Sequence, residues 1–277
     1  MDRRLWPDSG QRALSVLRGQ TTSRLTDGVA AQIATPLADL CAHPDGPRDR
    51  QLLHGAQVCG IDARTGWSFV RAEVDSYCGW VQSAALGPHV TPTHRVVSLA
   101  SHLYSRPDLK SPERAALPMN SLLALGSLEN GFAQTQSGAW VPLAHVRPLD
   151  ETAPDPVNVA RQFLGVPYLW GGNSWQGIDC SGLVQVALHT CGIACPADSD
   201  LQREALGPAL SDDAPFARGD IIFWQGHVAF VSGPDTLLHA TAFGMAVIEE
   251  PLFSALARID AQAHRLAVVR LKSVKGN

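Results

Sequence analysis

The sequence lacks a run of apolar residues long enough to cross a membrane, and it lacks long blocks of like charge. Its formal net charge is -4, with 17% of the residues charged. This balance argues against a nucleic-acid groove or a polybasic membrane patch. No apolar stretch of signal-peptide length follows Arg3 and Arg4, so we expect a cytoplasmic location. Small-molecule or peptide partners fit best, with no nucleic acid, no membrane and no obligatory protein partner.

Cysteines are few for a disulfide framework in a chain of 277 residues, and they are irregularly spaced, at positions 41, 59, 78, 180, 191 and 195. This usage favours reduced thiols. His189, Cys191 and Cys195 form no recognised ligand spacing, so no metal site is expected. Nothing in the sequence implies an organic cofactor either.

Two segments of the N-terminal half resemble each other. Residues 37–45 recur as residues 101–108, and Gly79-Trp80-Val81 recurs as Ala139-Trp140-Val141, with an offset of 63 residues at the start and 60 at the end. We interpret this as an internal duplication. Short β-prone stretches broken by Gly, Pro and Asp predict a small barrel in each copy. A linker rich in Pro and acidic residues follows, so we predict domains over residues 1–92, 93–150 and 151–277.

The C-terminal part predicts helices followed by strands. Asp155 can cap a helix that buries Val157, Ala160 and Leu164 and stops at Gly165. Two more helices are expected, over about 180–190 and from Asp198 or Ser199 to Gly207. Apolar runs then predict strands, over residues 221–224, 228–231, 237–238, 246–248 and 266–271. This order is typical of an α+β fold.

Cys180 is the most informative residue, because it stands where a turn feeds an apolar helix, in Asp179-Cys180-Ser181-Gly182-Leu183-Val184. Unpaired N–H groups and the helix dipole favour a thiolate at that position. His227 and His239 follow in strand-like runs, so a base and an orienting residue are available. A single histidine would more often be a satisfied, partly buried side chain.

Together with 166–172 and 218–224, these motifs resemble the NlpC family of papain-like cysteine peptidases, which cut bacterial cell-wall peptides. The likeness spans roughly the last 120 residues, in the family's motif order. It implies a papain-like fold in which Cys180 attacks an amide carbonyl, His227 exchanges the proton and His239 holds His227. It also implies that Tyr168 helps to stabilise the oxyanion. The two β-rich copies resemble bacterial SH3-type domains.

The likeness is greatest to members with N-terminal SH3-type domains, which cleave the bond between γ-D-glutamate and diaminopimelate or lysine in peptides with a free N-terminal L-alanine. A free ammonium needs a carboxylate and accepting oxygens. The resemblance implies that Asp198 and Ser199 provide them and that Tyr77 closes the site. The expected substrate-binding residues are Asp49, Tyr77, Trp170, Asp179, Ser181, Asp198 and Ser199.

Several of these residues have plainer interpretations. Tyr168 and Tyr77 could simply be packed aromatics, Asp198 or Ser199 a helix N-cap, and Asp49 a solvated loop residue. Two departures from the family pattern affect pocket shape, because Ala229 and Ser76 stand where relatives mostly have Gly.

The sequence therefore predicts a cytoplasmic cysteine endopeptidase that trims recycled murein peptides and releases L-Ala-D-Glu. One rival is a catalytically inert protein that binds cell-wall fragments. Another is an amidase or acyltransferase acting on a non-murein substrate. A third is an exported enzyme that acts on the intact wall.

Overall fold

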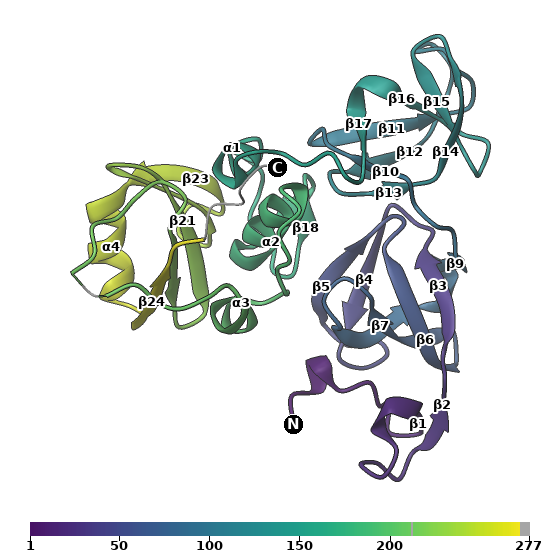
Figure 1. Ribbon diagram of the computed structural model, residues 1–277, viewed down its shortest axis with the longest axis horizontal. Helices are drawn as coiled ribbons and strands as arrows, with labels where there is room; N and C mark the ends of the chain where they lie inside the picture. Colours follow the sequence, from purple (N-terminus) through teal and green to yellow (C-terminus); the bar gives the residue numbers. More distant parts are fainter. Residues whose placement is uncertain (212, 272–277) are drawn as a thin grey trace. The chain divides into compact units, whose positions relative to one another are not determined.

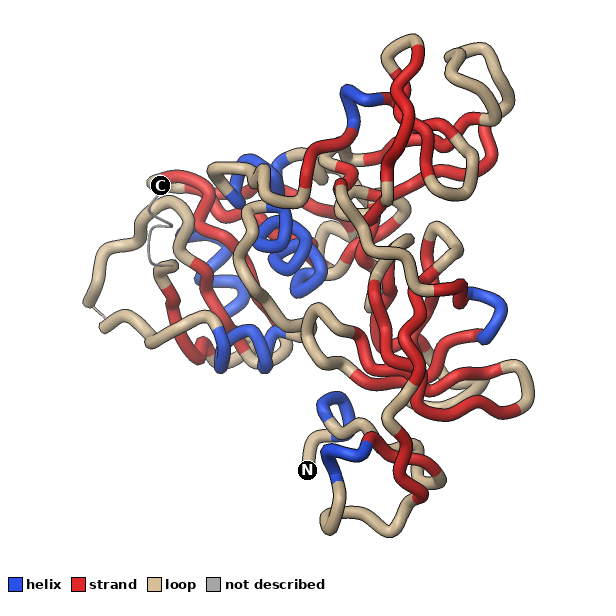
Figure 2. The backbone as a smooth tube through the Cα atoms, turned by 45° about the vertical axis from the view of Figure 1, so that its right-hand side comes forward, coloured by secondary structure: helices blue, strands red, loops and turns tan. Residues whose placement is uncertain are grey.

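The computed structural model describes residues 1–211 and 213–271 and divides into two compact units, residues 1–151 and residues from 152 onward. The first unit is built almost entirely of strands, and the second mixes helices with one main sheet (Figures 1 and 2). Within the described ranges, no helix is both long and apolar enough to span a bilayer. The three-domain division stays a prediction.

The strands of the first unit fall into three groups. An N-terminal arm, residues 1–28, holds the parallel pair β1 (Arg12–Leu14) and β2 (Arg24–Thr26). The first β region contains β3 (Val29–Ile33), β4 (Leu37–Cys41), β5 (Arg48–Leu53), β6 (Gln57–Arg64), β7 (Trp67–Ala72), β8 (Cys78–Gln82) and β9 (Leu86–Pro88). The second β region contains β10 (His94–Val96), β11 (Ala100–Tyr104), β12 (Glu113–Pro118), β13 (Leu122–Leu123), β14 (Leu125–Glu129), β15 (Phe132–Thr135), β16 (Trp140–Pro142) and β17 (Val146–Pro148).

The two β regions repeat one pattern of strand pairing. The first is a seven-stranded sheet in the order β5-β4-β8-β7-β6-β3-β9, and the second has a five-stranded sheet in the order β12-β11-β16-β15-β14 beside a three-stranded one. Cys41 of β4 pairs with Trp80 of β8, and Tyr104 of β11 pairs with Trp140 of β16. A register shift precedes Cys41 and Tyr104 in their other pairings. These correspondences carry the sequence offsets of 63 and 60 residues.

Each β region has its own apolar interior, and the two meet at a hairpin end. Leu14 of the arm packs with Phe69 and Trp80 of the first β region. At the junction, the Leu122 N–H donates to the His54 carbonyl at 2.9 Å. Gly55 lies at φ +76°, and a Cβ there would come within 2.1 Å of the Leu122 carbonyl oxygen, so only glycine fits this approach.

The second unit contains four helices and a five-stranded antiparallel sheet among its described residues. Its helices are α1 (Pro156–Arg161), α2 (Cys180–Thr190), α3 (Ser199–Ala205) and α4 (Leu252–Asp260). The sheet has the order β23-β22-β21-β20-β24, and the strands are β18 (Asn173–Ser174) and β19 (Gly177–Ile178), which form a separate hairpin, then β20 (Ile221–Trp224), β21 (His227–Gly233), β22 (Thr236–Thr241), β23 (Ala246–Pro251) and β24 (Arg265–Val269).

Helices α2 and α4 lie on opposite sides of this sheet (Figure 1). The apolar face of α4, with Leu252, Ala255, Leu256 and Ile259, packs on Trp224 and its neighbours. Helix α2 contacts β21 and β22 and buries Leu183, Val184 and Ala187, as predicted. The α+β prediction for this unit is confirmed, because burial from both sides requires a sheet that is apolar on both faces.

Two details of the secondary-structure prediction were wrong. The first helix ends at Arg161, and Leu164 is 45% exposed, because the chain turns before that residue can reach the helix's buried face. Helix α4 was not predicted, although its buried residues follow an i, i+3, i+4, i+7 spacing. Asp155 does cap α1, accepting the Val157 N–H at 2.8 Å.

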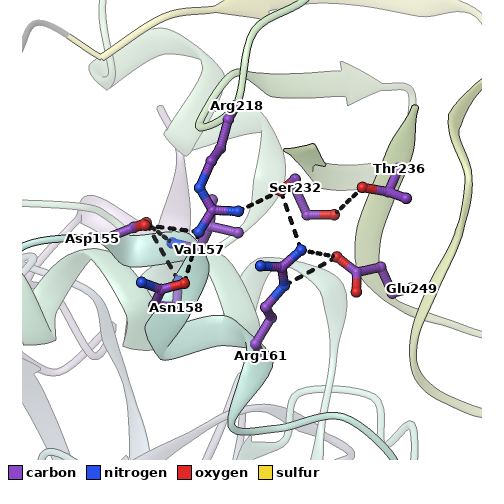
Figure 3. Close-up of polar contacts among 8 residues, drawn as sticks. All are labelled: Asp155, Val157, Asn158, Arg161, Arg218, Ser232, Thr236 and Glu249. Carbon is purple, nitrogen blue, oxygen red and sulfur yellow. Dashed lines mark hydrogen bonds and ion pairs between the residues drawn. The ribbon is translucent and has the colours of Figure 1, made fainter. Parts of the chain in front are cut away.

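A polar network fixes α1 to the sheet (Figure 3). The Arg218 guanidinium pairs with Asp155 at 2.7 Å, and the Arg161 guanidinium pairs with Glu249 at 2.7 Å. Both guanidinium groups also donate to the Ser232 carbonyl on β21. The network leaves the sheet edge and α1 in one arrangement, which places the segment after α1 beside β23.

Candidate active site

The nucleophile candidate is the first residue of α2. Asp179 caps that helix, and its Oδ1 accepts the Gly182 N–H at 2.7 Å and the Ser181 hydroxyl at 3.0 Å. Its Oδ2 accepts the Gly171 N–H at 2.8 Å. Burial raises the pKa of Asp179, while these three donors act against that rise. The carboxylate therefore ties together the turn before Cys180 and the helix after it.

The Cys180 sulfur is buried against the start of β21. Burial raises the pKa of the Cys180 thiol to about 12, and the negative Asp179 adds to this rise. The backbone N–H groups of Val228 and Ser181 oppose it. Val228 directly follows His227, so the sulfur lies beside the strand that carries the first histidine. The resting pair is neutral, and the nucleophile must lose its proton to a neighbour when it attacks.

The structure brings His227 and His239 together. They stand on the adjacent strands β21 and β22, with 2.8 Å between His227 Nε2 and His239 Nδ1. Burial lowers the pKa of His227 to about 3 and that of His239 to about 4, and the Arg258 charge acts in the same direction. Both rings are therefore neutral near pH 7, which is the form that can accept a thiol proton.

Two residues that the sequence did not indicate continue this chain of contacts. His239 Nε2 lies 2.8 Å from Glu250 Oε1 on β23, and Arg258 of α4 pairs with the same carboxylate. His239 itself has no exposed surface. No sequence motif marks Glu250, because the contact depends on how β23 pairs with β22.

Tyr168 lies near the nucleophile. Its N–H donates to the Met245 carbonyl at 2.9 Å, and it bridges to Ile178, two residues before Cys180. Burial raises the pKa of Tyr168, and the nearby Cys180 and Asp179 raise it further, so its hydroxyl keeps its proton. Trp170 is 68% exposed, as are Phe243 at 68% and Met245 at 61%. Trp170 thus offers an aromatic face on the surface rather than in the core.

Asp198 stands next to this centre but does not cap α3. Its side chain makes no capping hydrogen bond, and its backbone has φ +63°, a left-handed value that costs a non-glycine residue strain. The plainer N-cap interpretation of Asp198 is therefore wrong. Its charge also acts on Asp179. Ser199 is the first residue of α3 and half-buried.

Gln202 joins α3 to the nucleophile helix, and the sequence did not indicate it. Its amide Nε2 donates to the Ser181 carbonyl at 2.9 Å and to the Pro196 carbonyl at 3.1 Å, and the side chain is fully buried. The contact fixes the segment that carries Asp198 against the first turn of α2. A polar residue on a short helix gives no sequence signal for this contact.

Asp49 and Tyr77 belong to the first unit. Asp49 lies on β5, and both of its oxygens accept from Arg3 of the arm, at 2.8 and 3.0 Å, so it is not a solvated loop residue. Tyr77 is buried, with the Arg50 guanidinium 5.3 Å from the centre of its ring. Arg50 forms a buried ion pair with Asp75, which also accepts the Tyr77 N–H at 3.2 Å.

A buried cysteine at a helix start, beside a histidine pair on a neighbouring sheet, is the arrangement of a papain-like cysteine hydrolase. Residues 165–258 match the NlpC/P60 family, and residues 40–86 match the bacterial dipeptidyl-peptidase Sh3 domain. The chain belongs to the NlpC/P60 family of cysteine peptidases and carries a bacterial SH3 domain in its first unit. The resemblance noted in the sequence is confirmed.

Related proteins share much of the chain. A γ-D-glutamyl-L-lysine dipeptidyl-peptidase of Bacillus cereus is 30% identical over 164 residues, which span 55% of this chain and 46% of that protein. The protein of the same name from Bacillus subtilis is 26% identical over 254 residues, spanning 82% and 83% of the two chains. The solved structure of an NlpC/P60 family protein from Bacillus cereus matches with a TM-score of 0.74 and 22% identity, over 87% of this chain and 99% of that one.

Proposed function

We propose that this peptidase hydrolyses the bond between γ-D-glutamate and an L-diamino acid in murein peptides with a free N-terminal L-alanine. It would release the L-Ala-D-Glu dipeptide, so it would act as a dipeptidyl-peptidase. The observation that carries the proposal is the contact chain from Cys180 through His227 to His239, set beside a strained Asp198. The names of the two Bacillus relatives support the same bond.

In the proposed reaction, the Cys180 sulfur attacks the carbonyl carbon of the γ-glutamyl amide. His227 takes the thiol proton and later gives it to the leaving amine, which leaves a thioester for water to hydrolyse. Negative charge forms on the carbonyl oxygen during attack. The Cys180 backbone N–H and the Tyr168 hydroxyl would stabilise it, and losing one such donor typically raises the barrier by about 3 kcal/mol.

The ammonium of the N-terminal alanine would be bound by Asp198 and Ser199, with Ser181 and Asp179 lining the pocket and Trp170 at its margin. A positive group placed there would offset the negative charge of Asp198 on the neighbouring Asp179. From the first unit, Tyr77 and Asp49 would contribute to the same recognition. No cofactor is needed for this chemistry, since a nucleophile and a base suffice.

We also propose that residues 93–150 form a second SH3-like domain, because the second β region repeats the strand pairing of the first. We propose a cytoplasmic role in recycling cell-wall peptides. Cell fractionation with an antibody to the chain tests the location, and recovery of the protein outside the cytoplasm contradicts it.

The test of the function uses purified wild type and Cys180→Ala with L-Ala-γ-D-Glu-meso-diaminopimelate and with the lysine peptide, reading L-Ala-D-Glu by mass spectrometry. We expect release by wild type only. We also expect acetylation of the alanine amine to remove most of the activity. Activity in Cys180→Ala contradicts the mechanism, equal rates on free and acetylated peptides contradict the role of Asp198, and no release by wild type contradicts the function.

A further inference from the structure

Glu250 stands behind the histidine pair, on the side away from the nucleophile. Its Oε1 lies 2.8 Å from His239 Nε2, and the opposite nitrogen of His239 lies 2.8 Å from His227 Nε2. The side chain of Glu250 is 16% exposed, and that of His239 is fully buried. Four groups on four elements, α2, β21, β22 and β23, therefore follow one another from sulfur to carboxylate.

This chain of contacts determines where the protons lie. A carboxylate only accepts hydrogen bonds, so the neutral His239 ring must carry its hydrogen on Nε2. Its Nδ1 is then an acceptor, and the neighbouring His227 must donate from Nε2. That leaves Nδ1 of His227 without a hydrogen, which is the state needed to take the proton of Cys180.

Two charges border this chain at its carboxylate end. Arg258 of α4 pairs with Glu250 and lies 3.9 Å from the ring centre of Phe243. Glu249, the preceding residue on β23, pairs instead with Arg161 of α1. Without the Glu250 charge, the positive Arg258 would stand unopposed near two imidazoles, and it would disfavour a proton on His227.

We propose that Glu250 is a positioning residue of this active site, which sets the hydrogen positions of both histidines and offsets positive charge formed on His227 during attack. The proposal rests on the proposed function only in taking Cys180 and His227 as the reacting pair. Glu250 does not contact substrate in this role and acts through His239.

The test measures iodoacetamide alkylation of Cys180 from pH 5 to pH 10, by mass spectrometry of its peptide, in the full chain. The variants are Glu250→Gln, which keeps the size of the side chain but removes its charge, and the matched control Glu249→Gln. Cys59, which is partly exposed in the first unit, reports the ordinary behaviour of a thiol in the same sample. Turnover of the murein peptide is measured in parallel.

For Glu250→Gln we expect alkylation of Cys180 near pH 7 to fall about 10- to 100-fold, as is common when a residue that orients a reacting histidine is lost. The rate should rejoin that of wild type at alkaline pH, where the thiolate forms without a base. We expect kcat to fall by a similar factor with KM unchanged, and Glu249→Gln to stay within twofold of wild type.

The proposal is overturned if Glu250→Gln alkylates and turns over like wild type. It is also overturned if Cys180 in that variant becomes more reactive with the pH profile of Cys59, since this outcome means only a loosened fold. If Glu250→Gln does not fold, by circular dichroism, Glu250→Asp takes its place with the same criteria. If wild type cleaves no murein peptide but the alkylation difference persists, the proposed function fails and the role of Glu250 stands.

Discussion

The two β regions of the first unit share a scaffold but satisfy their interiors differently. In the first β region, Arg50 is paired with Asp75, and both side chains are buried, with 7% and 2% exposure. By the strand pairing, Ala115 stands at the position of Arg50 in the second β region. There the hydroxyls of Thr135 and Ser137 bond each other at 2.9 Å instead.

The difference teaches that the scaffold does not need the buried ion pair. A buried ion pair adds little net stability over neutral packing of the same volume. In the first β region, however, Arg50 and Asp75 both contact Tyr77, through its ring and its N–H. The second β region has Ser137 at the corresponding position, 60 residues on. The charges therefore serve to hold one tyrosine.

The largest expected effect is on stability. Arg50→Ala leaves Asp75 buried without its partner, and we expect the free energy of unfolding to fall by about 3 to 5 kcal/mol. Arg48→Ala, on the same strand but in an exposed pair with Asp39, should lower it by less than about 1 kcal/mol. Urea unfolding measures both.

A double change sharpens the same point. Arg50→Ala with Asp75→Thr reproduces the second β region in the first, and we expect most of the lost stability to return while peptide cleavage stays impaired. Full recovery of cleavage in the double variant would refute the idea that the pair serves Tyr77.

The next largest effect concerns the tyrosine hydroxyl. We expect Tyr77→Phe to lower kcat/KM for the free tripeptide by about tenfold, the value of one lost hydrogen bond of about 1.4 kcal/mol. Tyr104→Phe, in the second β region, should leave kcat/KM unchanged. Steady-state kinetics decide between the two regions, and equal losses in both variants contradict the assignment of recognition to the first.

A smaller effect is expected at the arm. Arg3 pairs with Asp49 in an exposed position, and a substrate ammonium bound by Asp49 must displace it. Exposed pairs contribute about 0.2 to 1 kcal/mol. We therefore expect Arg3→Ala to lower KM for the free peptide by up to about fivefold, with kcat unchanged. A raised KM contradicts a role for Asp49 in binding the ammonium.

The smallest effect is on the pH dependence of stability. Burial lowers the pKa of His54, so the folded chain binds that proton less readily than the unfolded chain. The stabilisation is complete above the unfolded pKa of about 6.5 and is lost as the pH falls below it. Met119 stands at the equivalent strand end of the second β region. We expect His54→Met to reduce the loss of stability between pH 7.5 and pH 5, and an unchanged loss contradicts this.

The parts of the structure that depend on local sequence were predictable. Asp179 before an apolar helical spacing, and Gly192 after it, give α2 its observed limits. The spacing of the motifs around Cys180 and His227 was sufficient to identify the family. The repeated tryptophans at 80 and 140 revealed the duplication, because each occupies the same paired position.

The remaining contacts depend on tertiary structure and could not be predicted. Glu250 reaches His239 only because of the register between β22 and β23. Arg3 meets Asp49, 46 residues away, only because the arm folds back. Asp198 could be either an N-cap or a ligand until its backbone angle was known. Such contacts arise from packing between elements, which local patterns do not encode.

The Asp179 carboxylate limits which mutations the lineage could accept. Its two oxygens accept from three donors, so each must remain an acceptor. Asparagine has the same shape and is reached by one nucleotide change, yet it would turn an N–H₂ group toward one of those N–H donors. Usually the mildest replacement for aspartate, it is a damaging one here. Gly182 is equally restricted, because a Cβ would lie 2.6 Å from the Gly172 oxygen. The segment that presents the nucleophile has almost no neutral neighbours in sequence space.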